Sequence, residues 1–153
     1  MRALDAVLTK LRKISGSHLV ALVSTSGQPI TISPGDPGQD TLSLAALAAG
    51  SFAATRQLAA LLSERQFTLL FHEGERSNLH VVQVSDHVLL LLTFGRDTQV
   101  GRVRLYTSRA VEALKPIIDG AHDAGSDSMV NVDEVFSNEL GLALDDLLSD
   151  EGR

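Results

Sequence analysis

Cysteine is absent from this chain of 153 residues. No disulfide bridge is therefore available to the fold, and no thiolate can act as a nucleophile or bind a metal ion. A reducing, cytoplasmic location is consistent with this absence. Residues 1–13 contain no continuous apolar run and do not resemble a secretory signal. The longest apolar candidate, residues 41–62, contains Arg56, Gln57 and several hydroxyl groups, so we expect no membrane span there.

A basic patch of the kind that binds nucleic acid is not indicated either. The net charge of −6 is unevenly distributed along the chain. Residues 1–124 carry 12 Lys and Arg against 11 Asp and Glu, a net charge of +1, whereas residues 125–153 have a net charge of −7. A nearly neutral body with an acidic tail lacks the electrostatic footprint of a nucleic-acid-binding protein.

The motifs of several common enzyme classes are missing. The sequence has no G-x-x-x-x-G-K-[ST] or G-x-G-x-x-G nucleotide-binding motif, no H-E-x-x-H zinc motif and no G-x-S-x-G elbow. His72, Glu73, Glu75 and His80 could be imagined as metal ligands, because a short turn between paired strands could bring the two histidines together. Ordinary polar residues at strand ends would give the same pattern. We therefore predict no catalytic residue, no cofactor and no metal site.

Hydrophobic periodicity and turn residues divide the chain into helix, two strands, helix, three strands and helix. The predicted elements are residues 3–14, 18–23, 29–33, 41–62, 66–72, 78–84, 88–94 and about 100–114. The last helix is expected to kink at Pro116 or to stop before it. Turns of hairpin length make the strands mainly antiparallel, which predicts an α+β sheet with helices on its faces. The apolar run at residues 88–94 indicates a central strand.

Residues 41–62 are apolar on both sides of the expected helix. Large side chains fall on one side (Leu44, Leu47, Leu58, Leu61 and Leu62), and small ones fall nearly opposite (Ala46, Ala49, Gly50, Ala53 and Ala60, with Gln57 among them). A helix that only covered a core would normally show polar residues on its second side. One interpretation encloses the helix within its own domain. The other places the leucines on the sheet and offers the small residues to another chain.

The strand expected at residues 66–71 follows this helix directly and is a candidate for an edge of the sheet. An unpaired edge strand can pair with a second copy and continue the sheet across a two-fold axis. Loops of the same chain could equally cover that edge. Pro29 favours an edge position for the strand at residues 29–33, because proline cannot donate a hydrogen bond to a neighbouring strand.

Several segments together resemble the Roadblock/LC7 domain superfamily. They are LAALAAGSFAATRQLAALL at residues 44–62, FHEGERSNL at residues 71–79, VLLLLTF at residues 88–94 and GRVRL at residues 101–105. Within the superfamily they look most like the MglB proteins, which regulate Ras-like GTPases of the MglA type. The resemblance covers about residues 3–120. It implies a five-stranded antiparallel sheet with the central helix on one face and the first and last helices on the other.

The same resemblance implies a function. MglB-like proteins are homodimers that pair through the strand after the central helix, here Gln66, Phe67, Thr68, Leu69, Leu70 and Phe71. Two copies bind one MglA-like GTPase through the central helices, here at Ala46, Gly50, Ala53 and Gln57. They stimulate GTP hydrolysis by repositioning the switch region of the GTPase without an arginine finger, so Arg56, Arg65 and Arg76 are not assigned that role. A role in bacterial cell polarity or gliding motility follows, in the cytoplasm and concentrated at a cell pole.

Two further expectations complete the prediction. The domain would span residues 1–124, and the acidic tail, residues 125–153, would contain a short amphipathic helix at residues 139–150. That helix resembles a C-terminal segment that in some members touches the GTPase and favours nucleotide exchange. The alternative function is a non-catalytic scaffold or a nucleotide-exchange adaptor for a small GTPase.

Overall fold

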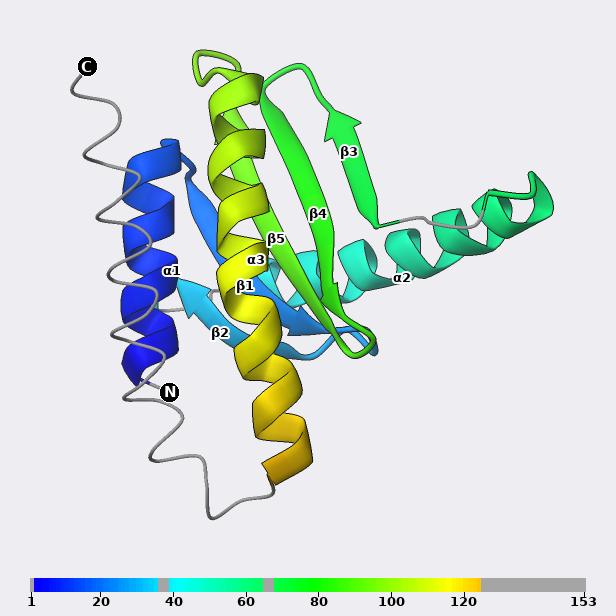
Figure 1. The fold of residues 1–153 in the computed structure, drawn as a ribbon. Coiled ribbons are helices and arrows are strands. Elements are labelled where there is room, and N and C mark those ends of the chain that lie inside the picture. Colours follow the sequence, from blue (N-terminus) through cyan, green and yellow to red (C-terminus); the bar gives the residue numbers. More distant parts are fainter. Residues whose placement is uncertain (1, 36–38, 65–67, 125–153) are drawn as a thin grey trace.

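The computed structural model of the chain describes residues 2–35, 39–64 and 68–124, and its elements follow the predicted order (Figure 1). They are helix α1 (Arg2–Ser15), strands β1 (Leu19–Ser24) and β2 (Pro29–Ser33), helix α2 (Gln39–Leu61), strands β3 (Leu69–Glu73), β4 (Ser77–Ser85) and β5 (Val88–Gly95), and helix α3 (Val100–Ala124). The acidic tail and its predicted helix at residues 139–150 lie outside the described residues.

The strands form one antiparallel sheet in the order β2-β1-β5-β4-β3. β5 lies at the centre, as its uninterrupted apolar sequence predicted, and its residues Leu89 to Leu92 are fully buried. β2 and β3 are the two edge strands. The edge positions predicted from Pro29 and from the chain order after α2 are therefore confirmed.

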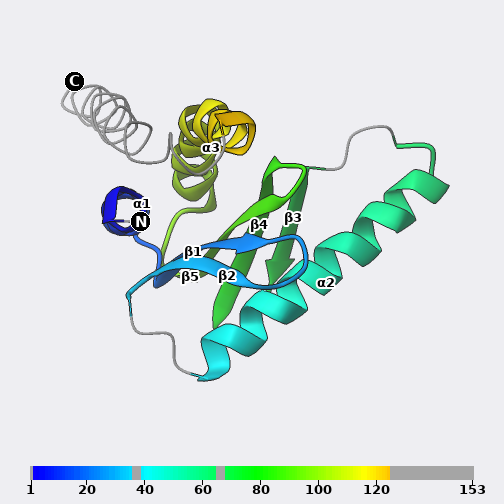
Figure 2. The same cartoon turned by 90° about the horizontal axis from the view of Figure 1, so that it is seen from below.

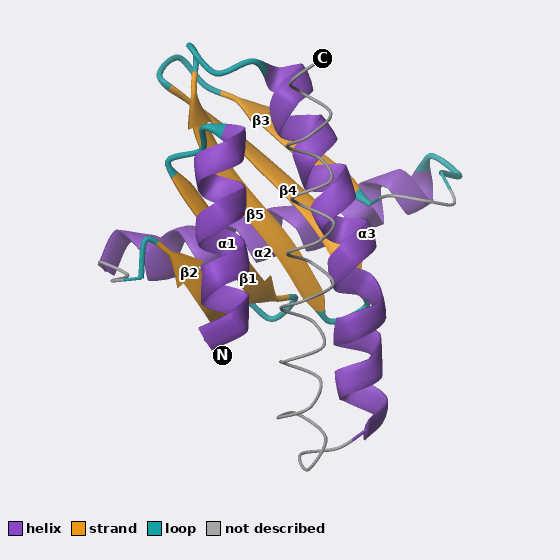
Figure 3. Cartoon of the chain, turned by 60° about the vertical axis from the view of Figure 1, so that its left-hand side comes forward, coloured by secondary structure: helices purple, strands orange, loops and turns teal. Residues whose placement is uncertain are grey.

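The helices cover both faces of the sheet (Figures 2 and 3). On one face, α1 contributes Leu8 and Leu11 to an apolar cluster, and α3 contributes Tyr106 and Leu114 to the same cluster. On the other face, α2 packs alone, and Phe52 belongs to a second cluster. The predicted α+β arrangement, with one helix on one face and two on the other, is confirmed.

The turn between β1 and β2 passes close to α2. Gly27 in this turn has a φ of +94°, and a Cβ atom there would lie 3.0 Å from the Cα atom of Ala46. A residue with a side chain would be strained in this conformation, and the backbone of α2 would have to move by a few tenths of an ångström to admit it. The turn therefore strongly favours glycine, and it lies against α2.

α3 differs from its prediction in length. It continues past Pro116 to Ala124, so the predicted stop before the proline is wrong. The apolar side of the helix continues across the proline, because Ala110, Leu114 and Ile118 follow each other at intervals of four residues and pack against one cluster. Packing on both sides of Pro116 compensates for the backbone hydrogen bond that proline removes.

Candidate functional site

α2 packs on the sheet through small side chains and one phenylalanine. Ala45, Ala48, Ala49 and Phe52 are each at most 3% exposed and share a cluster with residues of β1, β2, β4 and β5. The sequence predicted the reverse orientation, with the leucines on the sheet and Ala49 facing outward. That prediction is wrong. The buried side of a helix is normally recognised because the opposite side is polar. Both sides of α2 are apolar, so hydrophobic periodicity cannot identify the side that faces the sheet.

Most of the large leucines of α2 instead face outward, whereas Leu44 is partly buried against the cluster on the sheet. Leu58, Leu61 and Leu62, at the end of α2 and just after it, are exposed by 55% to 84%; we call these three side chains the leucine surface. Leu47, in the first half of the helix, is exposed as well. The interpretation in which the helix is enclosed within its own domain is therefore excluded for the single chain. Single exposed apolar side chains are common on protein surfaces, whereas a cluster of them often marks a site of protein interaction.

The residues predicted to contact a GTPase lie on this outward side. Ala46, Gly50, Ala53 and Gln57 are all exposed, and their spacing places them along one stripe of the helix, beside the leucine surface. A Cβ atom added at Gly50 would meet nothing within 4 Å. The stripe therefore offers nearly bare helix backbone to an incoming surface. Its role in binding stays a prediction.

The strand predicted to form a dimer lies at an edge of the sheet. β3 pairs with β4 on one side, with Leu69 opposite Val82 and Phe71 opposite His80, and no described strand pairs with its other side. Its backbone is thus available to a further strand. The carbonyl of Thr68, just before β3, accepts a hydrogen bond of 2.8 Å from the Gln83 amide. The predicted Gln66 and Phe67 lie outside the described residues, and the pairing of two copies stays a prediction.

The free edge and the leucine surface lie on the same side of the molecule. The last turns of α2 extend beyond β3, and in both views no described strand lies over them (Figures 1 and 2). These turns carry Leu58 and Leu61, which are more than half exposed. The end of the helix is therefore uncovered at the place where the sheet stops.

The two histidines considered as metal ligands are not close together. His72 is paired with Leu79, the residue before His80. Since neighbouring residues of a strand point to opposite faces, His72 and His80 lie on opposite faces of the sheet. Within the described ranges no three His, Cys, Asp or Glu residues are grouped so that they could hold a metal ion. The described residues therefore give no support to a metal site built from His72 and His80.

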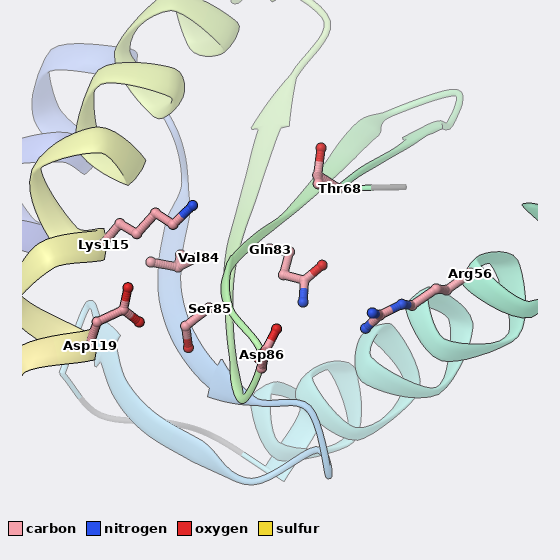
Figure 4. Close-up of a pocket in the computed structure, with 8 residues that line it drawn as sticks. All are labelled: Arg56, Thr68, Gln83, Val84, Ser85, Asp86, Lys115 and Asp119. Atoms are coloured by element: carbon pink, nitrogen blue, oxygen red, sulfur yellow. The ribbon is translucent and has the colours of Figure 1, made fainter. Parts of the chain in front are cut away.

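Arg56 points away from the stripe of small residues. It extends from α2 toward the strands and lines a pocket of about 320 Å³ (Figure 4). The pocket is lined by Arg56, Thr68, Gln83, Val84, Ser85, Asp86, Lys115 and Asp119. The two cationic groups are balanced by two carboxylates, so this pocket shows no preference for a charged ligand. Arg76 is exposed in the turn between β3 and β4, and Arg65 lies outside the described residues.

By length and composition alone, the segment Asp40–Leu61 of α2 could cross a membrane. A single helix of this kind is weak evidence, because core helices of soluble proteins meet the same criterion. Ala48 and Ala49 of this helix are packed on the sheet. The outward leucines are equally suited to a protein partner, and the expected absence of membrane contact stays a prediction.

Known proteins share this architecture. The Roadblock/LC7 domain family matches residues 3–94. The structure of MglB from Myxococcus xanthus is 36% identical, with a TM-score of 0.71, over 76% of this chain and 95% of that one. The gliding protein MglB from Thermus thermophilus is 34% identical, with a TM-score of 0.69, over 78% of this chain and 90% of that one.

A third structure, an MglB with a tetrameric arrangement, is 33% identical, with a TM-score of 0.67, over 75% of this chain and 86% of that one. Among curated protein sequences none matches the chain. The matched family covers more than half of the chain, and the three structures exceed 30% identity over most of their length. This chain therefore belongs to the Roadblock/LC7 domain family and is similar within it to the MglB proteins.

Proposed function

We propose that the chain is a homodimeric activator of a Ras-like small GTPase of the MglA type. Two copies bind one GTPase and stimulate GTP hydrolysis in the cytoplasm, in bacterial cell polarity or gliding motility. The similarity to MglB proteins supports this kind of partner. The observation that carries the proposal is the uncovered apolar side of α2 next to the free edge of β3.

The proposed dimer is based on the last turns of α2, which extend beyond the edge strand β3 (Figures 1 and 2). A second copy that pairs its β3 antiparallel to the first would continue the sheet across a two-fold axis. The two α2 helices would then lie side by side on one face of the joined sheet, with their uncovered ends against each other. Leu58 and Leu61 would leave water on both copies. One similar MglB has a tetrameric arrangement, which supports self-association in this group.

The GTPase contact follows from the stripe of Ala46, Gly50, Ala53 and Gln57. Small side chains let a switch element of the GTPase approach the helix backbone closely. Binding that stabilises one arrangement of a mobile switch shifts its population, and groups already aligned for catalysis then lower the barrier to hydrolysis. Arg56 extends toward the strands instead of this stripe, so the catalytic groups in this mechanism belong to the GTPase itself.

The test is the rate of GTP hydrolysis by the MglA-like GTPase of the same genome, with and without the chain. The proposal expects strong stimulation. Binding without stimulation would support the scaffold or exchange adaptor instead, and release of a fluorescent nucleotide would separate those two. A GTPase that neither binds nor responds would overturn the proposal.

Substitution of Ala53 by arginine tests the contact face. Ala53 is exposed, so Ala53→Arg should leave the fold intact and abolish GTPase binding, because a long charged side chain then occupies the stripe. Ala6→Arg is the matched control, since Ala6 is an exposed alanine of α1 on the opposite face of the sheet. Binding is measured by titration calorimetry and folding by circular dichroism. Normal binding by Ala53→Arg would show that the face is misassigned.

A further inference from the structure

A second pocket lies on the face of the sheet opposite α2, between α3 and the strands β3 and β4. Its volume is about 310 Å³, at the lower end of the usual range for small-molecule sites. Apolar walls come from Leu69, Val82, Val84 and Val111. Polar side chains come from both sides: Thr68, His80, Gln83, Arg104, Thr107, Ser108, Glu112 and Lys115. Thr68 and Leu69 also belong to the strand proposed for dimer pairing, whereas the other lining residues serve neither that pairing nor the GTPase contact.

Two buried polar atoms at this pocket lack hydrogen-bond partners. They are Nδ1 of His80, on β4, and Oγ1 of Thr107, on α3. Both residues are 1% exposed and line the pocket from facing elements. A buried polar atom without a partner costs stability, and native proteins contain few of them. Two such atoms beside one cavity therefore indicate a missing hydrogen-bonding group there.

The charges around the pocket favour a negative group. Arg104 and Lys115 line it, against the single carboxylate of Glu112. Lys115 also lines the first pocket with Asp86 and Asp119, so Arg104 is the cation that belongs to this pocket and not to the first. Burial, followed by the positive charge of Arg104, lowers the pKa of His80 from 6.5 to about 4. The ring is therefore neutral near pH 7 and keeps one N–H to donate. The Arg104 guanidinium also lies 5.4 Å above the centre of the Phe71 ring, which holds it beside β3.

We propose that this pocket binds a small carboxylate with an apolar body. The carboxylate accepts hydrogen bonds from the His80 ring, the Thr107 hydroxyl and the Arg104 guanidinium, and the apolar body lies against Leu69 and Val82. Hydrogen bonds between charged groups are the strong ones, so Arg104 contributes most to affinity. The site shares no residue with the stripe proposed to contact the GTPase, so that contact and this site can each fail without the other.

The test uses benzoate as the probe and the full chain labelled with ¹⁵N and ¹³C. Benzoate should shift the ring resonances of His80 and the amide of Thr107 in a saturable way. For a ligand of this size the dissociation constant is expected at about 10 mM or tighter. Benzamide has the same shape without the charge and should bind about tenfold more weakly.

Two variants and one control locate the site. Arg104→Gln should weaken benzoate binding about tenfold. Thr107→Val removes the hydroxyl at nearly constant volume, so it should weaken binding several-fold without lowering the melting temperature. Arg109→Gln, at an exposed position of the same helix outside the pocket, should bind benzoate normally. No saturable shift of His80 at about 50 mM benzoate, equal binding of benzamide, or unchanged affinity in Arg104→Gln and Thr107→Val would overturn the proposal.

Discussion

Replacing Leu61 by alanine is expected to weaken self-association of the chain about a thousandfold. Leu61 is 84% exposed in the single chain, so nearly its whole side chain is available to a partner. The substitution removes three carbon atoms, which at about 0.8 kcal/mol for each buried CH₂ contribute about 2 kcal/mol. In a two-fold dimer every substitution occurs twice. The total loss of about 4 kcal/mol corresponds to roughly three orders of magnitude in the dissociation constant.

Sedimentation equilibrium over a range of protein concentrations measures that constant, and circular dichroism shows whether the chain stays folded. Leu105→Ala is the matched control, because Leu105 is a leucine of α3 that is 49% exposed on the opposite face of the sheet. Its dissociation constant should equal that of the unchanged chain. If Leu61→Ala dimerises normally, or if both variants are weakened alike, the leucine surface is not the dimer interface.

Two further substitutions test the fold itself, each by urea denaturation at one fixed protein concentration. Gly27→Ala should lower the free energy of unfolding by about 1–3 kcal/mol, because residue 27 has a φ of +94° and the added Cβ would lie 3.0 Å from the Cα atom of Ala46. Gly35→Ala is the control and should be nearly neutral, because a Cβ atom there meets nothing within 4 Å. Equal effects would contradict the close approach. Between pH 6.5 and about 4 the unfolded chain protonates His80 and the folded chain does not, so stability should fall by roughly 3 kcal/mol as the pH is lowered through this range. His80→Leu should lack this part of the pH dependence, and an unchanged slope would refute the burial of a neutral ring.

Much of the fold could be predicted because its local signals agree with its tertiary packing. The strand at residues 29–33 was predicted with the bounds it has, since Gly27 and Pro29 define its turn and its edge position. The apolar run of β5 identified the central strand without any knowledge of its partners. Hairpin turns then left an antiparallel sheet as the simplest arrangement.

The predictions that failed depended on information that periodicity does not contain. Which side of α2 faces the sheet is decided by how close the helix must come to the strands, and Ala48 and Ala49 permit a closer approach than leucines do. The length of α3 is decided by packing of Ile118 beyond Pro116, which outweighs the local effect of the proline. The carboxylate pocket was missed because His80 on β4 is distant in sequence from Arg104 and Thr107 on α3, and the three residues form no motif.

Under the proposed function, the orientation of α2 would link dimer assembly to regulation of the GTPase. The leucine surface and the stripe containing Gly50 and Ala53 share the outward side of one helix. A dimer that buries the leucines of two copies brings their two stripes toward each other, and a GTPase that contacts both stripes then binds the dimer and not the single chain. Leu61→Ala should consequently lose stimulation of GTP hydrolysis at low protein concentration and regain it at high concentration, although Leu61 lies outside the predicted contact. Ala53→Arg should stay inactive at every concentration. Stimulation by Leu61→Ala that does not depend on concentration would show that the monomer suffices, and the proposed link between assembly and regulation would be wrong.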